Sequence, residues 1–379
     1  MLSWKSVTLT LTNLTVFVRR MLRADYCPYS LIFKETAVTS RDVMSRKDTY
    51  LLRLWDDSLP EVKGIGEIAM FRGLSAEDDV DFEANMVESL TAFCHTGIMP
   101  VNMSSLIFGI ETAMQNLKHD ALSLVFPSRF TSGEKSICIN GLIWMGDFQK
   151  MMCRLENKID EGFRCIKIKI GGIDFNDELR LLQYIRKRLR HKVLTIRLDA
   201  NGSFSRLSQK ESVERLKRLS DFDVHSIEQP FSVREKQRTA EVVALKIIPI
   251  ALDEQLIGVR TREEKDRILN EINPDYIILK PSLCGGFAHS MDWIELADSR
   301  GVGWWVTSAL ESAIGLNAIA QWTASVGVRD FPQGLGTGEL YVNDFPSPLI
   351  RKGEWLKFSD NGYSTEVYDK LMWKDVPAI

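Results

Sequence analysis

Two apolar runs near the middle of the chain decide its fold class: CIKIKI at residues 165–170 and VLTIRL at residues 193–198. Each run has the length and the β-branched composition of a buried strand, and the charged stretch 174–189 between them has helical periodicity. The same alternation continues on both sides of this unit. Further apolar runs lie at residues 137–139, 224–227, 247–252, 276–279 and 303–306, with an eighth near 333–335.

Repeated strand–helix units predict an α/β fold with a parallel sheet. Eight such units match a closed (β/α)8-type TIM barrel, which needs about 250 residues. An open dinucleotide-binding sheet fits less well, because no GxGxxG follows the first strand. Since the chain has 379 residues, we also expect an N-terminal α+β capping domain that the C-terminal tail completes.

The expected domain boundaries follow the points where the repeat starts and stops. We assign residues 1–20 to a non-structural N-terminal extension and 21–130 to the capping domain. Residues 131–340 form the catalytic barrel in this division, and 341–379 return to the capping domain. Within the capping domain we expect a meander of strands, with the polar stretch 37–48 as a loop.

Composition and charge narrow the kind of partner. The net charge of −3, from 48 basic and 51 acidic residues, gives no basic stripe for nucleic acid and no polybasic patch for a membrane. We therefore expect a small-molecule partner. The six cysteines contain no CxxC pair, which favours reduced thiols and a cytoplasmic location, and no HExxH zinc motif occurs. The oligomeric state stays open.

A polar residue follows the apolar run in each of six successive units. The intervals between these residues are 30, 29, 25, 27 and 28 positions, about one strand–helix repeat each. Barrel strands are buried on both faces, and barrel active sites lie at the carboxyl ends of the strands. We therefore expect one shared site at that end, formed by Lys169, Asp199, Glu228, Asp253, Lys280 and Ser308.

The three acids of this set predict a metal site. Asp199, Glu228 and Asp253 come from three adjacent strands, and carboxylates that converge repel one another unless a cation lies between them. Oxygen ligands suit Mg²⁺, with Mn²⁺ as a substitute. The alternative for any one acid is a salt bridge or a helix N-cap, but three acids at repeat spacing favour the metal.

The lysines predict a general base. Lys167 and Lys169 are two positions apart on one strand, so both face the barrel interior, while the alternating isoleucines face the helices. A free lysine has a pKa of about 10.4, and a neighbouring ammonium and a divalent cation both lower a lysine pKa. Lys280 lies on the opposite side of the barrel. A KxK motif alone would fit a solvated pair equally well.

Together these motifs resemble the enolase superfamily, in its muconate-lactonizing-enzyme branch. The resemblance rests on KIK at 167–169, DANG at 199–202, EQP at 228–230, DE at 253–254 and LKP at 279–281. It implies a magnesium-dependent enzyme in which a lysine removes a proton next to a carboxylate. It implies that Lys169 is this base, that Lys167 assists it, and that Lys280 supplies charge from the other face.

Finer motifs resemble members of that branch that dehydrate a cyclohexadiene carboxylate. By this resemblance Ser308 and Gly336 hold the substrate's side chain and Arg41 belongs to an N-terminal loop, although Asp42 stands where a glycine is expected. Asn201 is expected to support the metal site. The plainer alternatives are an ordinary strand-to-helix turn at Ser308 and a turn asparagine before glycine at Asn201.

Three other functions remain open at this stage. A racemase or epimerase of acylamino acids would use Lys169 and Lys280 as two opposed bases. A non-catalytic ligand-binding barrel would be expected to lack one of the charged positions, whereas all are present. A phosphate-binding barrel would need a helix N-terminus after its last strands, which the turn at 334–338 does not clearly supply.

Overall fold

The computed structural model describes residues 22–38, 43–119, 122–189, 194–327, 331–361 and 363–378. The assigned extension 1–20 and the candidate substrate residue Arg41 therefore lie outside the described residues.

The capping domain is an antiparallel sheet covered by two helices. Its strands β1 (Leu22–Val38), β2 (Val43–Asp56), β3 (Lys63–Ile68) and β14 (Lys374–Asp375) are ordered β14-β1-β2-β3. The helices α1 (Phe82–Thr96) and α2 (Ser104–Leu117) pack on one face of this sheet in a shared apolar core. Glycine lets α2 approach closely, because a Cβ at Gly66 would lie 2.1 Å from the carbonyl oxygen of Gly109.

The loop expected at 37–48 is wrong for most of its length. β1 continues to Val38, and β2 begins at Val43, with Val38 paired to Val43 and Ala37 to Met44. The polar residues at the start of β2 are largely exposed, while Lys47 and Thr49 are buried. Polar composition therefore marked a strand with a solvated face rather than a loop.

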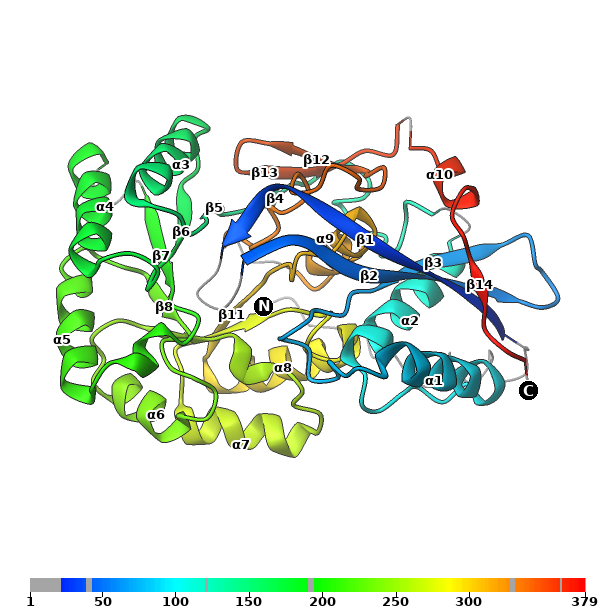
Figure 1. Cartoon of the computed structure of the whole chain (residues 1–379), viewed down its shortest axis with the longest axis horizontal. Coiled ribbons are helices and arrows are strands. Elements are labelled where there is room, and N and C mark those ends of the chain that lie inside the picture. The colour runs from blue at the N-terminus through cyan, green and yellow to red at the C-terminus, as the bar shows by residue number, and fades with distance from the viewer. Residues whose placement is uncertain are drawn as a thin grey trace, which may run out of the picture.

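The predicted barrel is confirmed as a ring of parallel strands with helices outside it (Figure 1). The seven strands β5 to β11 lie side by side in chain order. Gln333 and Gly334 close the ring, since they bridge in parallel to Ile139 and Thr307. Turns rather than an α-helix follow this eighth strand position.

The bounds of the barrel elements are as follows. The strands are β5 (Gly141–Ile143), β6 (Cys165–Lys169), β7 (Thr195–Asp199), β8 (Ser226–Glu228), β9 (Ile250–Leu252), β10 (Tyr276–Leu279) and β11 (Gly303–Val306). The helices are α3 (Phe148–Asp160), α4 (Phe175–Arg188), α5 (Gln209–Ser220), α6 (Lys236–Ala244), α7 (Arg262–Ile272), α8 (Gly286–Arg300) and α9 (Ala313–Ser325). Short 3₁₀ turns lie at Ser203–Arg206 and Glu254–Leu256.

The C-terminal segment contacts both parts of the molecule. The hairpin β12 (Leu349–Lys352) and β13 (Trp355–Phe358) pairs with β4 (Ile137–Cys138), directly before the first barrel strand. The chain then forms α10 (Glu366–Asp369) and reaches the edge of the capping sheet at β14. The segment thus joins the amino end of the barrel strands to the cap.

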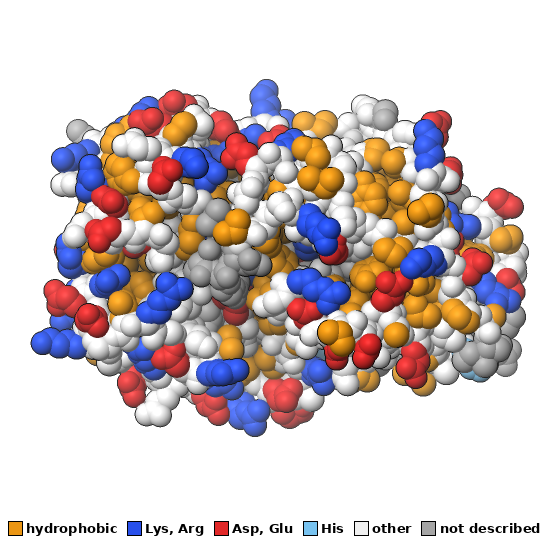
Figure 2. All heavy atoms as spheres, viewed as in Figure 1, with side chains coloured by type: hydrophobic (Ala, Val, Ile, Leu, Met, Phe, Trp, Pro, Cys, Tyr) orange, Lys and Arg blue, Asp and Glu red, His pale blue; other side chains and the backbone are white. Residues whose placement is uncertain are grey.

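Acidic and basic side chains are interspersed over the face in Figure 2. Within the described ranges, no helix combines the length and the hydropathy that a bilayer span requires.

Candidate active site

The strand β6 places its two lysines inside the barrel, as the alternation predicted. Ile166 and Ile168 are buried in the core that the barrel shares with its helices. Lys169 is 8% exposed and lines a cavity at the carboxyl end of the strands, together with Lys167. One face of β6 therefore packs in the hydrophobic core, and the other face lines the cavity.

Three carboxylates stand beside these lysines on the next strands. Lys169 is aligned with Asp199 on β7, and Asp199 with Glu228 on β8. Asp253 directly follows β9, and all three acids are about 1% exposed. The expectation that successive strand ends bring these residues together is met in the structure.

Lys280 follows β10, four strands from β6 in the ring, so it faces the acids from the opposite side. Its ammonium forms an ion pair with Asp253. Burial alone would lower the pKa of Lys280, but the combined charges of Asp253, Glu254 and Glu228 outweigh burial and raise it. We call these six residues the mouth cluster: Lys167, Lys169, Asp199, Glu228, Asp253 and Lys280.

Ion pairs hold the other half of the mouth cluster. Nζ of Lys167 lies 2.9 Å from Asp199 and 2.7 Å from Glu228. Nζ of Lys169 lies 2.9 Å from Asp199. The lysines thus provide the positive charge that three buried carboxylates require.

The pKa shifts show that the lysines do not compensate the negative charges of the acids equally. Burial would raise the pKa of Asp199, but Lys167 and Lys169 outweigh it and hold that pKa well below its usual range. Glu228 behaves differently, because burial and the nearby Asp199 raise its pKa well above its usual value. The positive charge of the lysines alone therefore does not fully offset the negative charge of Glu228.

The donor set fits a divalent cation. Each acid has one buried oxygen without a hydrogen-bond partner among the described residues: Oδ1 of Asp199, Oε2 of Glu228 and Oδ1 of Asp253. Across the same part of the chain, no group of three His, Cys, Asp or Glu side chains is close enough to hold an ion as it stands. The ammonium groups separate the acids, so an ion would bind by displacing them.

Asn201 lies next to the proposed base. Its Oδ1 accepts a hydrogen bond of 2.7 Å from Nζ of Lys169, and its Nδ2 donates one of 3.0 Å to Glu254. The backbone of Asn201 is left-handed, with φ of 42°, a conformation that asparagine tolerates better than most residues. The structure therefore connects Asn201 to Lys169 as well as to the region of the acids.

The cavity above the mouth cluster has a volume of about 90 Å³. Ser308 and Gly336, the expected side-chain contacts, both line it. The hydroxyl of Ser308 is already engaged, since it donates to Glu311 and accepts from Thr337 and from the backbone of Leu310. A direct bond from this hydroxyl to a substrate would require one of those bonds to exchange.

Sequence reasoning missed several walls of the cavity. Trp144 lines it and places its ring 5.6 Å from Nζ of Lys169. Residues two positions apart on a strand face the same side, so Trp144 faces inward like Asn140 and Leu142. The sequence therefore contained the information needed to predict this wall. The capping domain adds Phe71 and Leu74, for which no local pattern exists because they come from a distant part of the chain.

A second set of inward side chains lies below the mouth, toward the amino ends of the strands. Arg197, two positions before Asp199 on β7, is 1% exposed. Its guanidinium carbon lies 4.2 Å from the ring centre of Trp305 and 4.3 Å from that of Phe331. In the described structure, its Nε and Nη2 have no hydrogen-bond partner. We call this set the floor cluster: Arg197, His225, Tyr276, Trp305 and Phe331.

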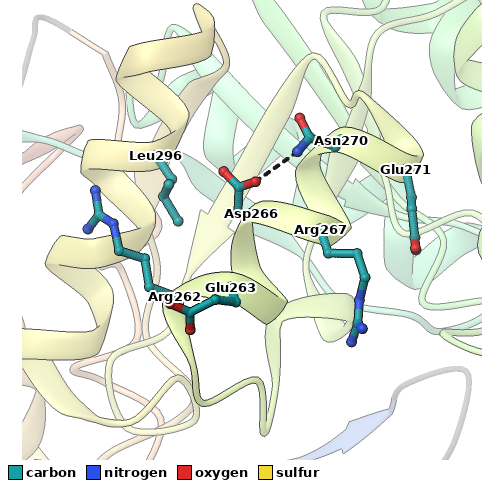
Figure 3. Close-up of a pocket in the computed structure, with 7 residues that line it drawn as sticks. All are labelled: Arg262, Glu263, Asp266, Arg267, Asn270, Glu271 and Leu296. Atoms are coloured by element: carbon teal, nitrogen blue, oxygen red, sulfur yellow. Dashed lines mark hydrogen bonds between the residues drawn. The ribbon is translucent and has the colours of Figure 1, made fainter.

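A larger hollow, of about 590 Å³, lies on the outer surface between α7 and α8 (Figure 3). Its lining is Arg262, Glu263, Asp266, Arg267, Asn270, Glu271 and Leu296. It contains no member of the mouth cluster, and its side chains form surface pairs such as the bond from Asn270 to Asp266. Size alone therefore does not identify the functional site here.

Comparison with known proteins agrees with this geometry. The family model described as "Enolase C-terminal domain-like" matches residues 150–369, more than half of the chain. The chain belongs to this family of barrel proteins.

Within the family, the chain is 41% identical over 375 residues to o-succinylbenzoate synthase of Desulfotalea psychrophila, covering 89% of this chain and 99% of that protein. The crystal structure of MenC from Desulfotalea psychrophila matches with a TM-score of 0.74 and 37% identity, over 89% of this chain and 99% of that one. A dipeptide epimerase from Cytophaga hutchinsonii, complexed with Mg and a dipeptide, has a TM-score of 0.72 at 18% identity, over 94% and 99% of the chains. This last likeness is one of fold alone.

Proposed function

We propose that this chain is a hydro-lyase that dehydrates 2-succinyl-6-hydroxy-2,4-cyclohexadiene-1-carboxylate to 2-succinylbenzoate. The relative of that name is 41% identical and is matched over 99% of its length. The observation that carries the chemistry is the mouth cluster, in which Lys169 and Lys280 face three buried carboxylates from opposite sides.

The resident ion in this proposal is Mg²⁺, with Mn²⁺ as a substitute, held by Asp199, Glu228 and Asp253. The support is one partnerless buried oxygen on each acid and the Mg named with the epimerase of the same fold. When bound, the ion supplies positive charge against the negative charge that grows on the substrate carboxylate as the adjacent C–H bond breaks.

In the proposed reaction, Lys169 carries out both proton transfers on one face of the ring. Neutral Nζ of Lys169 takes the proton from the carbon next to the carboxylate and then delivers it to the departing hydroxyl. Water leaves, and the ring becomes aromatic. Asn201, which accepts a hydrogen bond from Nζ in this structure, orients the lysine for that transfer.

The other two lysines assist without moving a proton. Lys167 keeps a second positive charge beside Lys169 and faces the substrate carboxylate. Lys280 provides a cation above the opposite face of the ring, where it stabilises the electron-rich intermediate. In our proposal Ser308, Gly336 and Arg41 contact the succinyl side chain, directly or through the backbone.

We further propose that the reaction serves menaquinone biosynthesis in the cytoplasm. The substrate is a small carboxylate, and neither nucleic acid nor membrane takes part. The reduced cysteines and the interspersed surface charge support this assignment.

A racemase or epimerase of acylamino acids is the second candidate, because two opposed lysines also suit it. It is favoured less, since an L-Ala-D/L-Glu epimerase is 29% identical over 47% of this chain and an N-succinylamino acid racemase 31% identical over 42%, against 41% over 89% for the synthase.

One experiment separates the two functions. The purified protein with Mg²⁺ is given the cyclohexadiene substrate, and loss of the diene absorbance is followed. In a parallel reaction, N-succinyl amino acids are incubated in D₂O, and α-deuterium is measured. We expect rapid loss of the diene and little deuterium. Deuterium incorporation without diene loss would contradict the proposed dehydration.

A further inference from the structure

A buried carboxylate behind one wall of the cavity takes no part in the chemistry proposed above. Glu311 is 1% exposed. Its Oε2 accepts hydrogen bonds of 2.7 Å from Oγ of Ser308 and 2.7 Å from the backbone N–H of Ala309. Its Oε1 accepts from Oγ of Ser282, which is fully buried. Bonds to a buried charge are stronger than neutral ones and are not exchanged with water.

These bonds join three separate loops of the barrel mouth. Ser282 lies two positions after Lys280, in the loop that follows β10, while Ser308 follows β11. Oγ of Ser308 in turn accepts a hydrogen bond of 2.8 Å from Thr337, in the turn after the eighth strand position. Lys280, Ser308 and Thr337 all line the cavity. The carboxylate of Glu311 therefore connects three of the segments that form the cavity wall, two directly and one through Ser308.

The loop held by Glu311 is strained. Leu310 lines the cavity and has a left-handed backbone with φ of 65°, a conformation that is unfavourable for any residue but glycine. Two bonds fix it, one of 3.0 Å from its N–H to Oγ of Ser308 and one of 2.7 Å from the hydroxyl of Tyr341 to its carbonyl oxygen. Strain of this kind persists only where the surroundings over-determine the conformation.

The capping domain fixes the far end of the same loop. Glu67 on β3 is fully buried and accepts bonds of 2.9 Å from the backbone N–H of Ser312 and 2.6 Å from its Oγ. It also accepts a bond of 3.1 Å from the N–H of Gly315, in the first turn of α9. The loop between β11 and α9 is thus held on one side by the barrel and on the other by the cap.

We propose that Glu311 is a positioning residue that fixes the shape of the cavity wall facing the substrate's side chain. It acts through Ser308, Ala309 and Ser282, touches no reacting atom and moves no proton. It therefore governs which carboxylate side chain the site accepts, and it affects KM more than kcat. The identity of that side chain as succinyl rests on the proposed dehydration.

The test is Glu311→Gln in the full-length, Mg²⁺-loaded protein. The amide can accept on one side only, so at least one loop loses its bond. We expect KM for the cyclohexadiene substrate to rise about tenfold while kcat falls less than about threefold. Ser282→Ala removes one bond to the same carboxylate and is expected to raise KM about threefold, which keeps the test valid if the first variant folds poorly.

The matched control is Glu354→Gln. Glu354 is also buried and accepts a hydrogen bond from a backbone N–H, that of Arg164, but it lies at the amino end of the barrel strands, directly before β13. We expect this variant to lose stability without changing KM by more than about twofold. A KM for Glu311→Gln within twofold of the parent value, or an equal rise in Glu354→Gln, would overturn the proposal.

Amide hydrogen exchange makes the test independent of the reaction. In Glu311→Gln, exchange at Ala309 and Leu310 should accelerate together with that in residues 281–286 and 336–338, because one carboxylate holds all three loops. Acceleration at Ala309 alone, or none, would refute the positioning role. If the parent protein fails to dehydrate the diene, the proposed function is wrong, and this measurement still decides the role of Glu311.

Discussion

The mouth and the floor of the barrel hold buried charge in two different ways. At the mouth, ammonium and carboxylate groups neutralise one another through ion pairs of 2.7 to 2.9 Å among Lys167, Lys169, Asp199 and Glu228. At the floor, the guanidinium of Arg197 packs against two neighbouring aromatic rings. Ion pairs can exchange a partner for an incoming ion, whereas a stacked cation stays where packing puts it. The comparison indicates that the mouth is built to rearrange and the floor to stay fixed.

The largest expected effect is at the mouth. Lys169→Ala should reduce dehydration by about 10³-fold or more, because it removes the group that carries out both proton transfers. Lys280→Arg should keep roughly a tenth of the activity, since a guanidinium can still face a ring. Turnover of the cyclohexadiene substrate is measured for both variants at equal folded concentration. Equal loss in the two variants would indicate a two-base reaction instead.

The exchange of partners at the mouth can be tested by removing one acid. Glu228→Gln should weaken Mg²⁺ binding by about 100-fold, as judged by calorimetry, because a charged ligand is lost. The metal-free variant should be at least as stable as the parent, since burial and Asp199 already raise the pKa of Glu228. Magnesium affinity equal to that of the parent would remove Glu228 from the metal site.

The floor should respond in stability and not in binding. Arg197→Ala removes the stacking on Trp305 and Phe331 and the bond of 2.8 Å to the carbonyl oxygen of Pro332. We expect the free energy of unfolding to fall by about 2 kcal/mol, with Mg²⁺ affinity within threefold. Denaturant unfolding and calorimetry measure the two quantities. A large loss of Mg²⁺ affinity would break the separation between mouth and floor.

The smallest expected effect is a pH dependence at the floor. Burial, and then the charge of Arg197, lower the pKa of His225 from 6.5 to about 4. Between pH 6.5 and 4, His225 therefore binds a proton in the unfolded chain but not in the folded protein. The free energy of unfolding thus falls as pH decreases through this window. After allowance for partial solvent exposure, the loss should be roughly 1–2 kcal/mol.

His225→Phe keeps the aromatic packing of the floor and should abolish that part of the loss. Denaturant unfolding at pH 7 and pH 4.5 gives the comparison, with His95→Gln as the control because His95 is exposed. An unchanged pH slope in His225→Phe would mean that other groups set the acid limit.

The inward residues of the strands could be predicted from sequence because alternation has a period of two. That rule placed Lys167 and Lys169 correctly, and it applies equally to Arg197, two positions before Asp199. The burial of Arg197 was not predicted, because an arginine side chain in a strand is usually solvated. Local patterns also cannot show that Glu67 of the cap holds Ser312 of the barrel, because 245 residues separate them.

The edge strand of the capping sheet has a consequence for biosynthesis. Asp25 on β1 pairs with Asp375 on β14, so the barrel segments leave the ribosome between the two halves of this contact. The barrel segments emerge while one edge of β1 still lacks its partner, and unpaired edges invite association with other chains. The capping sheet, and with it the roof of the cavity, is therefore completed only after the barrel segments have been made.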